Sequence, residues 1–349
     1  MLDDRNGRPA RPPSALYSAT RGQRLGHDAV VLCGPDGLRA EISRHGATLL
    51  RLARNVRGQP WDFAWGYDSK SGLETHADSR FALMVPFAGR IRESAYTFGG
   101  QTRELESHPA DPGHVAMHGL ARDVDFHIAA LHASPHLAST LLTATIGPVA
   151  GYPFRIAVDV LFELAGTGLQ VAATMRNVGD TDAPCFFGWH AYVRPAAGKV
   201  DDWVLHVPAR QRIAMGQDLI AVDGPAAYTP VGARRELDFS APRKIGGTVI
   251  DNAYGDLVPR SDGRIRCTAC DPVSGTSVAV WQYGGIVRVF TGDTLAHGAR
   301  EAIAIEPMEA IANAFNRADC RERVTLAPGA SKVFRCGIDL DVAPRGDHA

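Results

Sequence analysis

IAVDVLFELAGTGLQVAATM, residues 156–175, is the stretch of sequence that decides the fold. Apolar residues alternate with other residues from Ile156 to Leu164, and the alternation resumes from Leu169 to Met175. Such a period of two is typical of strands that bury one face. The segment between them, residues 165–168, reads Ala-Gly-Thr-Gly and suits a tight turn. The stretch therefore predicts an antiparallel β-hairpin.

Short β-like runs of the same kind recur along the chain. Residues 38–42 alternate and residues 46–50 follow them, while residues 277–283 and 286–290 flank Gly284 and Gly285 and predict another hairpin. Strong helical periods are few, and residues 73–81 and 309–315 are the segments expected to form short helices. Many strands without regular strand–helix alternation predict a mainly β protein, a large antiparallel β-sandwich with few short helices.

The two ends of the chain differ in composition from the rest. Residues 1–24 are rich in Arg, Pro, Gly and Ser and show no apolar period, which predicts a flexible N-terminal arm. Residues 343–349 predict a flexible tail in the same way. Residues 25–342 contain no linker long enough to mark a boundary and no internal repeat, so we expect one domain.

The overall composition limits the classes of partner. The 349 residues are 45% hydrophobic and 21% charged, and 37 basic residues nearly balance 38 acidic ones. Without a basic surplus, a nucleic-acid partner is disfavoured. The apolar runs are far shorter than the roughly 20 residues that span a bilayer, and the first residues lack the apolar core of a signal peptide. We expect a cytoplasmic protein without membrane attachment, either a monomer or a homodimer.

Two of the six cysteines, Cys267 and Cys270, have the spacing of half a zinc site. A structural zinc site needs a second ligand pair at similarly tight spacing, and none follows. The sequence therefore predicts reduced cysteines at a strand end and no metal ligand set.

A single carboxylate follows the apolar run Ala302 to Ile305. Glu306 comes directly before Pro307, where we expect the strand to be interrupted. A carboxylate at the mouth of an apolar strand is partly desolvated and held rigidly, as a general base that works near neutral pH requires. The alternative is a surface glutamate at a strand end.

Four further polar residues lie in apolar or glycine-bounded segments. Arg90 follows Gly89, His118 lies between Met117 and Gly119, His190 lies between Trp189 and Tyr192, and Asp251 follows Ile250. Aromatic rings beside polar groups suit a sugar, whose C–H face stacks on rings while its hydroxyls need hydrogen-bond partners. Each residue also has a plainer interpretation: a surface ion pair, a core histidine or a turn former.

Together these segments resemble the aldose 1-epimerases (mutarotases) of the galactose mutarotase-like superfamily, over roughly residues 28–340. No single motif is specific, but their order and spacing together are. The motifs that carry the resemblance are Pro86–Arg90 with Phe98–Gly100, His118–Gly119, Asn177–Asp180, Gly188–Tyr192, Ile250–Asn252, Ile305–Pro307 and Asn313–Asn316.

The resemblance implies a β-supersandwich and a cofactor-free ring-opening reaction on a small-molecule sugar. Glu306 would be the base that takes the proton from the anomeric hydroxyl, and His190 the acid that protonates the ring oxygen. The resemblance further implies sugar-binding roles for His118, Arg90, Asp251 and, from strand position alone, Gln282. Burial should raise the pKa of the glutamate, and a nearby carboxylate should keep the histidine protonated.

Several alternatives stay open at this stage. Gly89 and Ala191 depart from the residues of the better-known galactose-type members, and the run Gly119–Arg122 resembles divergent bacterial members that include enzymes of hexose 6-phosphates. A hexose-6-phosphate 1-epimerase would need converging cations, which Arg90, Arg92 and Arg122 could supply. A non-catalytic carbohydrate-binding protein is the other alternative. A lyase or hydrolase ranks last because no second matched carboxylate is evident.

Overall fold

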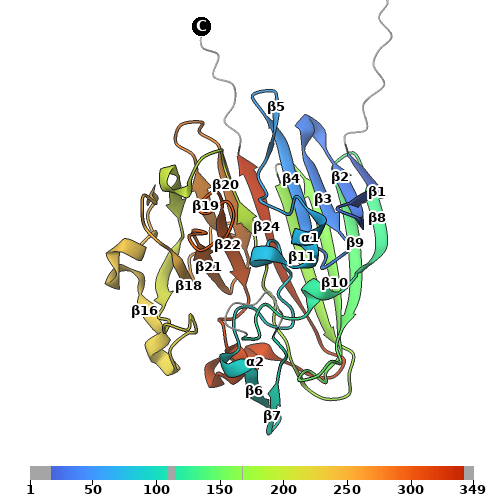
Figure 1. The fold of residues 1–349 in the computed structure, drawn as a ribbon, viewed down its shortest axis with the longest axis vertical. Helices are drawn as coiled ribbons and strands as arrows, with labels where there is room; N and C mark the ends of the chain where they lie inside the picture. Colours follow the sequence, from blue (N-terminus) through green and yellow to red (C-terminus); the bar gives the residue numbers. More distant parts are fainter. Residues whose placement is uncertain (1–16, 108–114, 167, 342–349) are drawn as a thin grey trace, which may run out of the picture.

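The computed structural model describes residues 17–107, 115–166 and 168–341, which fold into layered β-sheets (Figure 1). The strands are β1 Ser18–Arg24, β2 His27–Cys33, β3 Arg39–Ser43, β4 Leu49–Val56, β5 Gln59–Asp62, β6 Ala95–Phe98, β7 Gln101–Glu104, β8 His127–Ala133, β9 Leu137–Ile146, β10 Ile156–Ala165, β11 Gly168–Asn177, β12 Ala183–Pro184, β13 Tyr192–Val193, β14 Val204–His206, β15 Ala209–Ile213, β16 Tyr228–Pro230, β17 Arg243–Lys244, β18 Asp251–Leu257, β19 Ile265–Cys270, β20 Ser277–Gln282, β21 Ile286–Phe290, β22 Ile303–Met308, β23 Thr325–Leu326 and β24 Ser331–Asp341.

Helical structure is limited to short pieces. The α-helices are α1 Lys70–Glu74 and α2 Arg321–Val324. The 3-10 turns are η1 Pro35–Gly37, η2 Ala77–Ser79, η3 Arg92–Ser94, η5 Ala121–Asp123, η6 Val200–Asp202, η7 Gly224–Ala227, η8 Val231–Ala233, η9 Arg235–Leu237, η10 Ala314–Asn316 and η11 Ala318–Cys320.

Three large antiparallel sheets form two layers. A nine-stranded sheet, in the order β17-β14-β19-β20-β24-β11-β10-β9-β8, is one layer. A five-stranded sheet, β1 to β5 in sequence order, contacts its β8–β9 end, and a six-stranded sheet, β13-β22-β21-β18-β15-β16, contacts it through β20 and β22. In Figure 1 the blue strands and the orange strands lie on either side of the red β24. The predicted mainly β, antiparallel sandwich is confirmed.

The two smaller sheets of the second layer are joined edge to edge. The Trp65 N–H donates to the Tyr192 carbonyl and the Arg194 N–H donates to the Phe63 carbonyl, so the chain after β5 pairs with β13. The larger of two apolar clusters, which includes Leu32, Val160 and Ile305, fills the space between the layers. The second layer is therefore continuous across the molecule, and its six-stranded part carries the candidate site.

One predicted hairpin is confirmed and the other is wrong. β10 and β11 pair from Ile156↔Asn177 to Ala165↔Gly168. β20 and β21, however, belong to different sheets, so residues 283–285 cross from one layer to the other. Gly285, at φ +75°, allows the crossing because a Cβ there would lie 2.2 Å from the Met308 carbonyl oxygen. Alternation in two strands does not reveal which sheet each will join.

Both predicted helices are also largely absent. Residues 73–81 contain only the end of α1 and η2, because His76, Asp78 and Phe81 all have positive φ, which interrupts a right-handed helix. Residues 309–315 contain only the start of η10, which follows Asn313 at φ +63°. The first of these irregular segments lines the site described below, and the second supports the backbone around Arg90.

The N-terminal boundary was predicted too late. Residues 18–24 form β1, which pairs with β2 along its whole length, although composition assigned them to the arm. Residues 1–16 and the predicted tail, 343–349, lie outside the described residues. Strand β22 also continues through Pro307, contrary to expectation. Pro307 has no N–H, but its carbonyl accepts a hydrogen bond from the Trp189 N–H.

Within the described ranges, no helix is both long and apolar enough to cross a bilayer. Cys267 and Cys270 lie on β19 three residues apart, so their side chains point to opposite faces of the sheet and cannot share one ion. All six cysteines are free thiols.

Candidate active site

Strand alternation gathers the polar side chains on one face of the six-stranded sheet. Glu306 on β22 is directly opposite Arg288 on β21, and Arg288 is opposite Ala253 on β18. Asp251, two residues before Ala253, therefore shares that face with Arg288 and Glu306. The residues between them, such as Ile305 and Val289, point the other way and are part of the apolar core.

His190 extends the same face beyond β13. Tyr192 is paired with Ala304, and the Ile305 N–H donates to the Ala191 carbonyl, so His190 falls opposite Glu306. On its other side the His190 backbone is held by the segment 81–82: the His190 N–H donates to the Ala82 carbonyl, and the Phe81 N–H donates to the His190 carbonyl. His190 Nε2 lies 3.6 Å from Glu306 Oε1.

A paired loop brings Arg90 and His118 over this face. Arg90 and Met117 form an isolated antiparallel bridge, and the His118 N–H donates to the Gly89 carbonyl over 3.0 Å. Gly89 is required here, since its φ is +68° and a Cβ would lie 2.7 Å from the Cβ of Ala312. The His118 ring packs edge-on against the His190 ring at 5.0 Å, and its Nδ1 lies 2.7 Å from Met84 Sδ.

These residues line one cavity of about 510 Å³. Five of the six residues proposed from the sequence are present: Glu306, His190, His118, Arg90 and Asp251. The other lining residues are Asp78, Ser79, Gly89, Met117, Tyr192, Leu219, Arg288, Phe290, Thr294 and Leu295. The volume and the mix of apolar and polar groups are those of a small-molecule site.

Gln282 is not brought to this cavity. Its side-chain Nε2 donates to the carbonyls of Gly284 and Ile286, at 2.6 and 2.9 Å. It thus holds the corner where the chain crosses between the two sheets. The geometry gives no support to the sugar-binding role that strand position had suggested.

Burial controls the acid–base properties of Glu306. The carboxyl group is 1% exposed, and burial raises its pKa to about 8, opposed by the Arg288 and Arg90 cations and assisted by the Asp251 anion. Its Oε2 atom has no hydrogen-bond partner among the described residues. An acceptor in this position is suited to a ligand hydroxyl, because a buried oxygen left unpaired is costly.

Burial favours the neutral form of both histidines. Burial lowers the pKa of His190 to about 3, with further lowering by Arg288 and Arg122. Burial, with His190, Arg122 and Arg90, also lowers the pKa of His118 well below its usual value. The sequence-based expectation that a carboxylate keeps His190 protonated is therefore wrong, because burial and the Arg288 cation dominate the pKa of this imidazole.

The residue that sequence reasoning missed is Arg288. Its Nε lies 2.9 Å from Asp251 Oδ1, and its Nη2 also contacts that oxygen. Arg288 is 8% exposed, so this pair fixes a cation beside Glu306. The signal in the sequence was a single charged residue within the otherwise apolar run 286–290, which has the pattern of a buried strand.

The arginines considered for a phosphate do not all converge on the cavity. The side chain of Arg92 is 43% exposed, and its Nη2 lies 3.9 Å from Asp218 Oδ2. Arg122 is 1% exposed, its Nη1 lies 3.4 Å from Ser79 Oγ, and it does not line this cavity. Of the described arginines, the cavity is lined by Arg90 and Arg288, and Arg288 is already paired with Asp251.

A model of the family described as "Aldose 1-epimerase" matches residues 28–339 of this chain. The chain belongs to the aldose 1-epimerase family. The resemblance seen in the motifs is thus confirmed, and the protein is an enzyme of a family of isomerases.

Individual proteins are also similar to this chain. A protein of Escherichia coli strain K12, named "Uncharacterized protein YihR", is 32% identical over 237 residues, which is 67% of this chain and 71% of that protein. Solved structures share the fold at lower identity. A GalM/aldose epimerase homologue from C. elegans superimposes with TM-score 0.76 at 18% identity, over 89% of this chain and 97% of that one. A galactose 1-epimerase from Lactobacillus acidophilus superimposes with TM-score 0.75 at 15% identity, over 94% of this chain and 99% of that one.

One of the motifs that carried the resemblance, residues 313–316, supports the site through hydrogen bonds to the backbone. Asn316 Nδ2 donates to the Ala95 carbonyl, and Asn313 Oδ1 accepts from the Arg92 N–H. The Asn313 N–H in turn donates to the Arg90 carbonyl. The segment 313–316 therefore fixes the backbone that presents Arg90 to the cavity, without itself lining it.

Proposed function

We propose that this enzyme interconverts the α and β anomers of an unphosphorylated hexose or related aldose. The observation that carries the proposal is the Glu306–His190 pair. Glu306 Oε1 lies 3.6 Å from His190 Nε2, and both side chains line a cavity of about 510 Å³. A carboxyl group and an imidazole so placed can remove one proton and supply another on opposite sides of a C–O bond.

The reaction needs one base and one acid and consumes nothing. Glu306 takes the proton from the anomeric O1–H, the C1–O5 bond breaks as C1=O1 forms, and His190 gives a proton to O5. Rotation about C1–C2 followed by the reverse transfers closes the ring on the other face. Each group ends as it began, so the end point of the equilibrium does not change.

The pKa values of the pair put the required proton on Glu306 rather than on His190. With pKa values of about 8 for Glu306 and about 3 for His190, the pair at neutral pH is a carboxylic acid beside a neutral imidazole. Moving that single proton to His190 generates the reactive form. Hydroxyl groups of a bound sugar would donate to Glu306 and, with Arg288 close by, favour its ionised state.

His118, Arg90 and Asp251 would then orient the sugar. A neutral His118 can donate one hydrogen bond near the ring oxygen, while Arg90 donates and Asp251 accepts at the other hydroxyls. Tyr192, whose ring stacks on His190 at 5.0 Å, offers an aromatic surface at the cavity wall. This set suits a neutral polyol.

The placement of the arginines favours a free sugar over a 6-phosphate. A phosphate is held well where several cations converge with bidentate geometry. Here Arg288 is committed to Asp251, and neither Arg92 nor Arg122 lines the cavity. Asp78 and Asp251 add negative charge to its lining.

Polarimetry on freshly dissolved α-anomers of glucose, galactose, arabinose and glucose 6-phosphate tests the proposal. We expect faster decay of optical rotation for at least one free sugar, with an unchanged end point. A kcat/KM at least tenfold higher on glucose 6-phosphate than on every free sugar would instead establish the phosphosugar alternative. Rates equal to buffer across the panel, together with measurable sugar binding, would identify a non-catalytic binding protein.

A further inference from the structure

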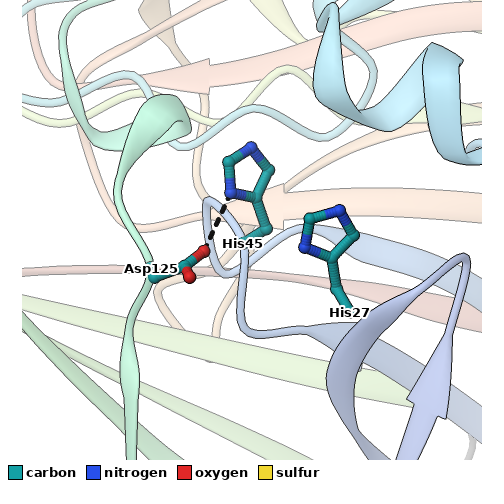
Figure 2. Close-up of side chains that lie close together, drawn as sticks. All are labelled: His27, His45 and Asp125. Atoms are coloured by element: carbon teal, nitrogen blue, oxygen red, sulfur yellow. Dashed lines mark hydrogen bonds and ion pairs between the residues drawn. The ribbon is translucent and has the colours of Figure 1, made fainter.

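A second cluster of ionisable side chains, none of which lines the cavity, lies where three segments of the chain meet. His27 begins β2, His45 lies in the turn between β3 and β4, and Asp125 lies just before β8. Figure 2 shows the three side chains converging from these separate segments. The backbones of His45 and Asp125 form an isolated bridge, so their approach is fixed by the main chain.

We propose that His27, His45 and Asp125 form a binding site for a divalent transition-metal ion of the zinc type. One nitrogen or oxygen atom from each of the three lies within 4.8 Å of the other two. Ligand atoms bound to one tetrahedral zinc ion at about 2.1 Å are separated by about 3.4 Å. The three ligand atoms therefore have to move somewhat closer together for all of them to bind one ion.

The His45–Asp125 pair already has nearly the required geometry. His45 Nδ1 lies 2.9 Å from Asp125 Oδ1, as the dashed line in Figure 2 marks. An ion would replace the hydrogen between these atoms and bind both. Arg44 lies 3.8 Å from the other carboxylate oxygen, Oδ2, and so leaves Oδ1 for the ion.

His27 is oriented as metal-binding histidines usually are. Its ring stacks beside that of His45 at 4.9 Å, and its Nε2 lies 3.3 Å from Glu74 Oε1. A carboxylate this close to Nε2 favours a proton on that nitrogen, although the contact is not a hydrogen bond in the structure, and a proton there leaves the lone pair of the other nitrogen for an ion. In this cluster that other nitrogen is Nδ1.

The chemistry of the ligands selects the class of ion. Two imidazoles with one carboxylate suit zinc, cobalt, nickel or copper, whereas calcium and magnesium prefer oxygen ligands alone. The His27 and His45 side chains are 17% and 16% exposed and Asp125 is 53% exposed, so an ion can enter from solvent and keep a water ligand. The carboxylates of Glu74 and Asp123 nearby favour a cation further.

An ion here would join three segments that are distant in the sequence. The His76 ring also stacks on the His45 ring, at 5.2 Å, and His76 comes two residues before Asp78 in the cavity wall. Binding would therefore stabilise the corner of the five-stranded sheet that lies next to the catalytic cavity. This inference does not depend on the proposed sugar substrate.

Zinc titration of the chelator-treated, full-length protein at pH 7.5 tests the site, by calorimetry and by elemental analysis after dialysis. We expect the wild type to bind one more zinc ion per chain than His27→Gln, or to bind it at least tenfold more tightly, and to show a higher Tm with zinc. Asp125→Asn, which keeps a hydrogen-bond acceptor for His45 but loses the charge, should weaken binding similarly. Cobalt should give visible d–d absorption bands that both variants lose.

The matched control is His132→Gln, an exposed histidine on β8, which should bind zinc as the wild type does. His27 and Asp125 lie on separate segments, so misfolding of one variant leaves the other as a test. Equal zinc stoichiometry and affinity in the wild type and in folded His27→Gln or Asp125→Asn would overturn the proposal, as would a wild type that takes up no zinc.

Discussion

Arg288 on β21 lies directly opposite Glu306 on β22, and it is held there by its ion pair with Asp251 on β18. The cation lowers the pKa of Glu306 while the anion raises it, so the three side chains form one coupled electrostatic unit. Together with burial, this arrangement leaves the pKa of the Glu306 carboxyl group near neutral pH, where the group can exchange a proton.

Removal of either partner should therefore shift the pH dependence in opposite directions. In Arg288→Gln the pKa of Glu306 should rise, and the pH–rate profile should move to higher pH; in Asp251→Asn it should move to lower pH. Profiles of kcat against pH for the three proteins provide the measurement. Profiles that coincide after normalisation would mean that Glu306 does not control the rate.

Glu306→Gln should lose about 10²- to 10⁴-fold in kcat, the usual contribution of a general acid–base group. The amide keeps the shape but cannot exchange the proton, so sugar binding measured by calorimetry should be retained. Glu301→Gln, which changes a half-exposed glutamate paired with Lys199, is the matched control. A kcat of Glu306→Gln within about threefold of the wild-type value would show that Glu306 is not the general base.

The two histidines should separate in steady-state kinetics. His190→Asn should act mainly on kcat, because His190 faces Glu306 and is assigned the transfer to O5. His118→Asn should show more of its effect in KM, since its assigned role is to bind the sugar. Saturation curves for both variants decide this, and a larger kcat loss in His118→Asn would exchange the two assignments.

The stability of the protein should also report the burial of Glu306. Its folded pKa of about 8 exceeds the unfolded value of 4.5, so the folded state binds more protons between these values and stability falls as pH rises through that window. The loss should approach about 1.4 kcal/mol for each pH unit. Denaturation from pH 5 to 8 should therefore show Glu306→Gln becoming progressively more stable than wild type. A difference independent of pH would contradict the raised pKa.

Gln282→Ala should reduce stability and leave KM nearly unchanged. The substitution removes the donor for two carbonyls at the crossing between the sheets, at a cost of about 1–3 kcal/mol. Chemical denaturation and sugar saturation curves measure the two effects. A KM increased tenfold or more, with little loss of stability, would return Gln282 to the sugar site.

The sequence alone determined the local structure and the identities of most site residues. Strict alternation specified β10 and β11 because a period of two buries only one face of a strand. The lone Glu306 after an apolar run was visible for the same reason, since a buried charge needs a function or a partner. Turn glycines such as Gly89 marked where the chain changes direction.

Tertiary structure decided what the strands do together. Alternation is the same whether a strand joins one sheet or another, so the crossing at Gly285 and the corner role of Gln282 were not evident. Likewise, only the register of β22, β21 and β18 places Arg288 between Glu306 and Asp251. The protonation of His190 also depended on the fold, because desolvation arises from every segment packed around a residue rather than from its neighbours in the chain.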